Sequence, residues 1–295
     1  MKEKTIRYVP TDASLKIAAE VAAKLGFSID AEKTGALALE LHRTYFDEII
    51  DLLEMDPKRF TFFQGSIRKV AAFADITRKG EKLIFFDEHF DFWLMTLTHL
   101  NTITTFKVLQ PEGYEDIAAL FELVLESMGT TDLHKTIRKK FKPYLLNHEK
   151  CLLFSHSFSK AMIAFILCHE IAHWNLAHFS EEKALRHEFE ADEQALVYFK
   201  ALIAKEENAN HLKFDERFLA APIVLMNYFS VYEKYAQAHL GIVPTREEHP
   251  DPIARSKQLW QATGFQDYPQ GKECLKAFLA GLKDIVDELD PELLK

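Results

Sequence analysis

Two histidines four residues apart, at the end of an apolar run, constrain this chain more than any other feature of its sequence. They lie in the segment His169-Glu170-Ile171-Ala172-His173, which directly follows the apolar run Ala161–Cys168. Residues four apart on an α-helix share one face, so a helix here places both imidazoles side by side. The apolar run predicts that this helix, which we expect over Ser157–His178, is buried in the core.

Helical periodicity also dominates the rest of the chain, and it predicts a mainly α fold with a small strand element. The clearest strand candidate is Lys82–Phe86, and the segment Gly241–Pro252, rich in Pro and charge, is expected to be a loop. The basic run His134–Lys142 is typical of a helix face exposed to solvent. Further helices are expected at Ser14–Leu25, Ala36–Met55, His89–Leu100, Asp116–Met128, Glu181–Ala204, Glu216–Leu240 and Lys272–Leu289.

The sequence shows no clear linker, but its two halves differ in character. Residues 1–150 form a mostly helical region that carries no motif of its own and could be a substrate-binding subdomain. Residues 151–295 carry the histidine pair and are expected to form a helical core. The aromatic segments Phe60–Phe63 and His89–Leu100 belong either to the core or to a groove that binds a substrate.

Composition and charge exclude several classes of protein. The 295 residues include 36 Lys+Arg and 45 Asp+Glu, a net charge of −9, so there is no basic surplus for nucleic acid. The longest uncharged stretch, Phe218–Tyr232, is shorter than the roughly 20 apolar residues of a membrane helix. Three widely spaced cysteines, an odd number, indicate reduced thiols, and the N-terminus shows no secretory signal. We therefore expect a cytoplasmic protein without a membrane or nucleic-acid partner.

Two neutral imidazoles on one helix face can hold one Zn²⁺, and the Glu between them can act as a general base. A zinc enzyme needs a third protein ligand and one open position. One solution is a third His six residues after the second, but that position is Phe179. The alternative is Glu188, separated from His173 by 14 residues and expected on a following helix. Asp192 lies four residues later on the same face, where it can accept the outer N–H of His169 or His173.

These segments, in this order, resemble the gluzincin metallopeptidases of the HtpX and CAAX-prenyl-protease type. The matching motifs are His-Glu-Ile-Ala-His and the Glu-x-Glu-Ala-Asp that follows it. His178 also matches, and the segment from His249-Pro250 to Arg255 is similar to their His-Pro-x-x-x-x-Arg. The resemblance covers roughly Ala161–Leu259. The lack of membrane helices and the short gap between the two motif helices are closest to the soluble Lit-type phage-exclusion peptidases.

The resemblance implies a zincin-like metallopeptidase core and a role for each matching residue. It implies Zn²⁺ as the cofactor, with His169, His173 and Glu188 as its ligands and Glu170 as the catalytic base. Asp192 would orient one of the ligands from outside the metal shell.

The roles of the remaining candidates stay open. By resemblance His249 lies in a loop near the metal, where it contacts the oxyanion, the substrate or the zinc, unless it is an ordinary loop histidine. Arg255 would anchor that loop or pair with an acidic group near the site. His178 and His187 are expected to be structural. The candidates for stabilising the oxyanion are His249, Arg255 and one of Tyr228, Tyr232 and Tyr235.

Together these roles describe a zinc-dependent endopeptidase that hydrolyses peptide bonds in a protein or peptide substrate. Zn²⁺ lowers the pKa of a bound water from 15.7 to about 7. Glu170 would take the proton of that water and pass it to the leaving amine. The alternative is a catalytically silent or tightly regulated metal-binding relative that acts as a binding or defence protein. Glu170 argues against it, because a purely structural site is closed by four ligands and needs no base.

Overall fold

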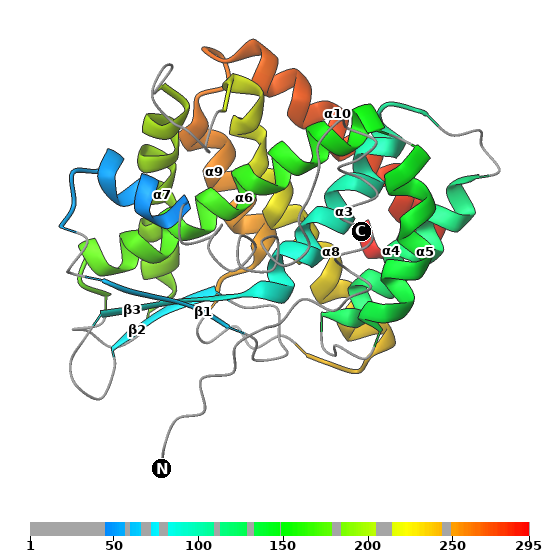
Figure 1. Cartoon of the computed structure of the whole chain (residues 1–295), viewed down its shortest axis with the longest axis horizontal. Coiled ribbons are helices and arrows are strands. Elements are labelled where there is room, and N and C mark those ends of the chain that lie inside the picture. The colour runs from blue at the N-terminus through cyan, green and yellow to red at the C-terminus, as the bar shows by residue number, and fades with distance from the viewer. Residues whose placement is uncertain are drawn as a thin grey trace, which may run out of the picture.

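The computed structural model shows a mainly helical chain with one small sheet, as the sequence predicts (Figure 1). It describes residues 45–56, 60–65, 72–76, 82–108, 113–128, 133–147, 149–178, 184–204, 214–243 and 249–294. The α-helices are α3 (Glu88–Thr105), α4 (Tyr114–Ser127), α5 (His134–Asn147), α6 (Glu149–Asn175), α7 (Leu185–Ala204), α8 (Ala221–His239), α9 (Pro252–Thr263) and α10 (Pro269–Leu289). Short 3₁₀ helices, η4 (Glu216–Ala220) and η5 (Pro291–Leu294), precede α8 and follow α10.

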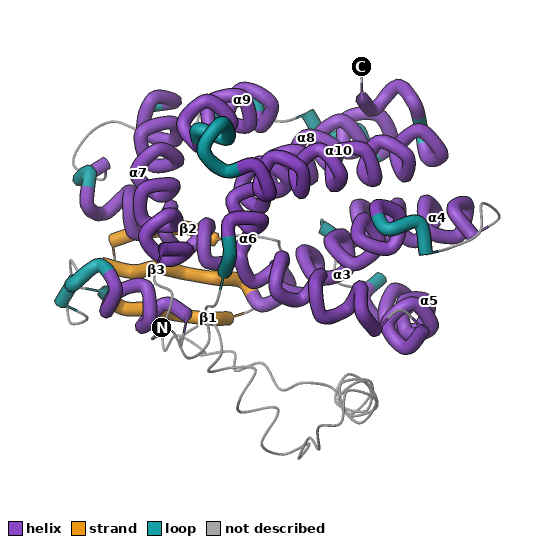
Figure 2. Tube along the Cα trace, turned by 90° about the horizontal axis from the view of Figure 1, so that it is seen from above, coloured by secondary structure: helices purple, strands orange, loops and turns teal. Residues whose placement is uncertain are grey.

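The sheet has three strands in the order β1 (Thr61–Gly65), β3 (Lys82–Asp87) and β2 (Ala72–Ile76). The central strand β3 pairs parallel with β1 and antiparallel with β2. Among the described residues, β1 and β2 are therefore the two edge strands. Figure 2 shows the sheet at one end of the molecule, beside α6 and α7 and away from α4 and α5.

α6 is the central helix, and its position explains why its sequence is so apolar. It packs against α7, α3 and α8 and against strands β2 and β3. Every residue from Ala161 to Ala172 is buried, the polar His169 and Glu170 included. The predicted burial of this helix is confirmed, although the helix begins earlier than expected, at Glu149.

By length and composition alone, the stretch Lys150–Asn175 of α6 could cross a membrane. This stretch contains no long uncharged run, because Lys160 and Glu170 interrupt its apolar residues. Most of its apolar window is buried inside the protein, as in the core helix of a globular fold.

Most of the predicted elements are confirmed, but two strands and one α-helix are not predicted by the sequence patterns. The strand at Lys82–Phe86 is β3, and the helices predicted from residue 89 onward are present with shifted ends. Residues 45–52 are helical as predicted, whereas Ser14–Leu25 lies outside the described residues. β1 and β2 were not expected, since each has five residues and is held by pairing with β3. α9 is also not predicted, because its N-terminal signals, Asp251 and Pro252, lie at the end of a segment rich in Pro and charge that is typical of a loop.

Most of the described aromatic residues of the two segments belong to the core. On α3, Trp93 and Leu97 are fully buried. On β1, Phe62 is buried and its ring stacks on Phe46 with the centroids 5.0 Å apart. The proposed division at residue 150 stays a prediction; it falls within the first turn of α6.

Candidate metal centre

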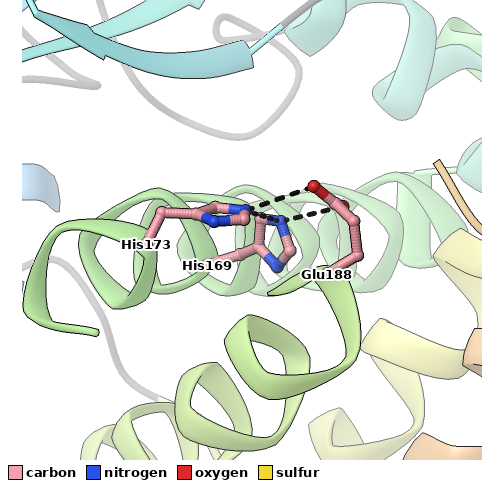
Figure 3. A group of neighbouring side chains, drawn as sticks. All are labelled: His169, His173 and Glu188. Atoms are coloured by element: carbon pink, nitrogen blue, oxygen red, sulfur yellow. Dashed lines mark hydrogen bonds and ion pairs between the residues drawn. The ribbon is translucent and has the colours of Figure 1, made fainter. Parts of the chain in front are cut away.

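The centre begins with the two histidines of α6. His169 and His173 are one helical turn apart, and their Nε2 atoms lie 3.0 Å from each other. Figure 3 shows both rings reaching toward the same carboxylate. Because α6 is buried here, His169 is only 7% exposed. The predicted pairing of these two imidazoles on one face is what the structure shows.

The third group is Glu188, in the first turn of α7. Its two carboxylate oxygens lie 3.5 Å from His169 Nε2 and 3.4 Å from His173 Nε2. Burial favours the neutral carboxyl, but hydrogen bonds from His169, His173 and His249 outweigh it and hold the Glu188 pKa well below its usual range. Glu188 is therefore an ionised group facing both imidazoles.

Asp192 lies one turn further along α7 and is fully buried. Its Oδ1 is 3.0 Å from His169 Nδ1, the ring nitrogen that points away from Glu188. Although burial opposes ionisation, the charge and hydrogen bonds of Arg255 lower the Asp192 pKa. A carboxylate at Nδ1 favours the His169 tautomer that carries its proton there, which leaves the Nε2 lone pair for another partner.

Arg255 joins the two carboxylates. Its Nε and Nη2 donate to the two oxygens of Asp192 at 2.7 Å each, and its Nη1 lies 3.1 Å from Glu188 Oε2. It reaches them from the first turn of α9, not from a loop. Of the two roles left open for Arg255, pairing with acidic groups at the site is the one that the geometry shows.

Glu170 lies beside this cluster and is 6% exposed. Burial, with the nearby charge of Glu188, raises its pKa to about 7, against the opposing effects of His169, Arg255 and a hydrogen bond from the Ala74 N–H. Ala74 is a residue of β2, so the sheet edge contacts the site through this backbone group. Sequence reasoning missed Ala74, because no residue type marks a backbone donor.

The pKa of His169 is also raised, but its nearby charges are the cause. Burial alone would lower its pKa, but the carboxylates of Asp192 and Glu188 raise it to about 10 in the metal-free protein. The neighbouring His173 has a lowered pKa, because burial outweighs the contact with Glu188. The buried carboxylates of Asp192 and Glu188 thus stabilise a positive charge at the position of His169.

The other predicted participants lie at or beyond the edge of this centre. His249 is 63% exposed, and its Nδ1 is 3.7 Å from Glu188 Oε2. The tyrosine hydroxyls have other partners: Tyr228 accepts a hydrogen bond from Asn101, and Tyr235 donates to Glu122 and Glu126. Tyr232 packs against the hydrophobic core.

A family model decides what kind of protein this is. The model of the peptidase U49 family matches residues 93–269, more than half of the chain. The chain belongs to the peptidase U49 family. This is a Lit-type peptidase family, so the predicted peptidase class and a protein or peptide substrate are confirmed. Comparisons with curated proteins and with solved structures give no match.

The family match includes the whole cluster described above. It begins within α3 and ends at the first residue of α10, so it holds both motif helices and α9. β2, whose Ala74 donates to Glu170, precedes it. In this U49 peptidase, the helices that carry the cluster lie within the residues that match the family model, whereas the strand that contacts Glu170 lies outside them.

The buried Glu170 carboxyl predicts a pH-dependent stability in the metal-free protein. Its folded pKa of about 7 exceeds the ordinary 4.5, so the folded chain holds this proton more tightly than the unfolded chain does. Ionisation therefore lowers the free energy of unfolding as the pH rises through this interval, by about 3 kcal/mol in total. Glu170→Gln, which cannot ionise, should be more stable than the wild type by that amount at about pH 8.

Urea unfolding of both metal-free proteins measures this difference. Most of it should vanish at about pH 5, where the wild-type carboxyl is neutral in the folded state. The comparison cancels the other titrating groups, His169 included, because both proteins contain them. A stability difference of the same size at both pH values would contradict the raised pKa.

Proposed function

We propose that this U49 peptidase is a zinc-dependent endopeptidase, with His169, His173 and Glu188 as the zinc ligands. The observation that carries the proposal is the spacing of the three donor groups. With zinc–ligand distances of roughly 2.0–2.2 Å, the edge of a tetrahedral site measures about 3.3–3.6 Å. The two Nε2 atoms are 3.0 Å apart, and each lies 3.4–3.5 Å from one of the two carboxylate oxygens of Glu188.

The charges around the three donors also fit a cation. Glu188 and Asp192 are buried carboxylates that face one guanidinium, that of Arg255. In the metal-free protein a protonated His169 balances the second carboxylate. A His169 that binds a metal must be neutral, and the cluster then carries a net charge of −1, which the bound cation would compensate. Two imidazoles and a carboxylate are also the donor types that zinc prefers in catalytic sites.

Three protein ligands leave one coordination position open, as catalysis requires. Zinc held by His169, His173 and Glu188 would supply Lewis acidity, which polarises a substrate carbonyl and makes a water acidic enough to lose a proton near neutral pH. Asp192 and Arg255 would hold His169 and Glu188 in place, since both contact these side chains directly.

Glu170 is the residue to which we assign proton transfer. Its carboxylate would accept the proton of the attacking water and donate it to the leaving amine as the peptide bond breaks. A buried carboxyl with a pKa of about 7 suits both steps, because both protonation states are accessible near neutral pH. His249, exposed at the edge of the site, is our candidate for contacting the substrate or its oxyanion.

The free edge of β2 is the proposed place for the substrate backbone. β2 pairs only with β3 in the described sheet, and Ala74 of β2 donates to Glu170. An extended peptide that adds to this edge would therefore run past the proposed base. This arrangement would recognise main-chain groups, as expected for a substrate that is a polypeptide.

Zinc content is the first test of the proposal. Elemental analysis of the purified protein should give about one zinc per chain, and His173→Ala should lose it, because two remaining donors cannot form a catalytic zinc site. The same preparations are assayed for peptide hydrolysis. If the wild type binds no zinc even when zinc is supplied, the proposed cofactor is wrong.

A further inference from the structure

A second group of polar side chains lies behind His173, on the side away from Glu188. It consists of His178, just beyond the end of α6, and of His187 and Glu190 on α7. Both histidines are buried, at 8% and 5% exposure, whereas Glu190 is largely exposed. Nothing in the proposed hydrolysis uses these residues, and the sequence alone predicts a structural role for the two histidines.

The chain turns sharply at the end of α6 to bring His178 back to His173. Ala177 adopts a left-handed conformation with φ of 58°, which is unusual for a residue other than Gly and typical of a helix end. The turn places His178 Nδ1 2.9 Å from His173 Nδ1. On the opposite edge of the ring, His178 Nε2 is 3.2 Å from Glu190 Oε2.

Only one proton fits between the two Nδ1 atoms, and its position follows from the other side of His173. His173 Nε2 faces His169 and Glu188, so a His173 that binds a metal through Nε2 carries its proton on Nδ1. His178 must then accept that proton's hydrogen bond through its own Nδ1. A neutral His178 with an unprotonated Nδ1 has its proton on Nε2, which points to the Glu190 carboxylate.

We propose that His178 is a positioning residue, which accepts the Nδ1–H of His173 and donates its own Nε2–H to Glu190. This chain would fix the ring orientation and tautomer of His173 and keep its Nε2 directed at the metal. The inference rests on the proposed zinc site. At His169, Asp192 contacts the outer ring nitrogen and is itself held by Arg255. At His173, His178 would take the place of Asp192, and Glu190 would take the place of Arg255.

The same three side chains could instead hold a second metal, since their ligand atoms lie within 4.8 Å of one another. The contact with His173 argues against this use. A metal on His178 Nε2 would leave the proton on Nδ1, where it would oppose the Nδ1–H of His173 across 2.9 Å. The rings of His178 and His187 also stack nearly parallel, with their centroids 4.3 Å apart. We therefore assign the group to orientation of His173.

Variants at residue 178 test this role through zinc affinity, measured by competition with a chelator. His178→Phe keeps a ring of similar size but offers no acceptor, and it should weaken zinc binding 10–100-fold, the usual cost of losing an outer partner. His178→Asn places its side-chain oxygen near the position of Nδ1 and should restore affinity to within a few-fold of the wild type. His187→Phe, the matched control, keeps the stacked ring and should bind zinc like the wild type.

The outcomes separate this inference from the proposed function. Wild-type affinity in His178→Phe, or equal loss in the Phe and Asn variants, would overturn the positioning role while leaving the zinc site intact. Two zinc ions per chain, with one lost in His187→Phe, would show that the group is a second metal site. A wild type without zinc would overturn both proposals.

Nitrogen NMR of the zinc-loaded wild type, labelled with ¹⁵N-histidine, tests the same chain without the Phe variant. We expect His173 to be protonated at Nδ1, and His178 to be protonated at Nε2 with Nδ1 as an acceptor. The signals of His178 are assigned by their loss in His178→Asn. A His178 protonated at Nδ1 would overturn the proposal even if His178→Phe fails to fold.

Discussion

Glu170→Gln should leave the zinc in place and lower the rate of peptide hydrolysis by about 10²–10⁴-fold, the usual contribution of a general base. The glutamine side chain has almost the same shape and can keep the hydrogen bond from Ala74, because its amide oxygen accepts as the carboxylate does. It cannot take a proton from water. The variant therefore removes one function and preserves the surroundings, including the two flanking histidines on α6.

The measurement pairs activity with metal content in the same preparation. Glu193→Gln is the control, since it makes the same chemical change on an exposed face of α7, where Glu193 contacts Gln258. It should retain both zinc and activity. Unchanged hydrolysis in Glu170→Gln would exclude Glu170 as the base, and a variant that loses zinc would show that Glu170 supports the metal site.

The part of the site that the sequence predicts correctly is the part set by helical periodicity. His169 and His173 share a face because they are four residues apart on one helix, and Glu188 and Asp192 do so for the same reason. Placing one pair opposite the other needs only that the two helices pack together, which their buried faces favour. The geometry shows this juxtaposition, while the metal itself stays a proposal.

The part that the sequence does not predict depends on contacts between distant segments. Ala74 reaches Glu170 through a backbone N–H, and its strand exists only because β3 pairs with it. The motif singles out Arg255, but its bridge between two carboxylates depends on α9, whose first residue lies in a segment that resembles a loop. The contact between His178 and His173 depends on the left-handed Ala177, which an alanine in the sequence does not signal.

Glu188→Ala and Glu190→Ala test which acid of α7 binds the metal, and they should differ sharply. Glu188 touches both His169 and His173, so its loss should weaken zinc binding by more than the 10–100-fold expected for an outer partner. Glu190 faces His178, and its side chain is 52% exposed. Its removal should weaken zinc binding only a few-fold, because His178 can still accept the proton of His173.

Chelator competition on the two variants, side by side, gives the measurement, and circular dichroism confirms that both are folded. The pair is well matched, since both changes remove one carboxylate from neighbouring turns of the same helix. They differ in the side of the His173 ring on which the carboxylate lies. Glu188 contacts His173 Nε2, whereas Glu190 is connected to His173 Nδ1 through His178. A large loss in Glu190→Ala with little change in Glu188→Ala would move the third ligand to Glu190. That result would reverse the two sides of His173, making Nδ1 the metal-binding nitrogen and the group with His178 and His187 the metal site.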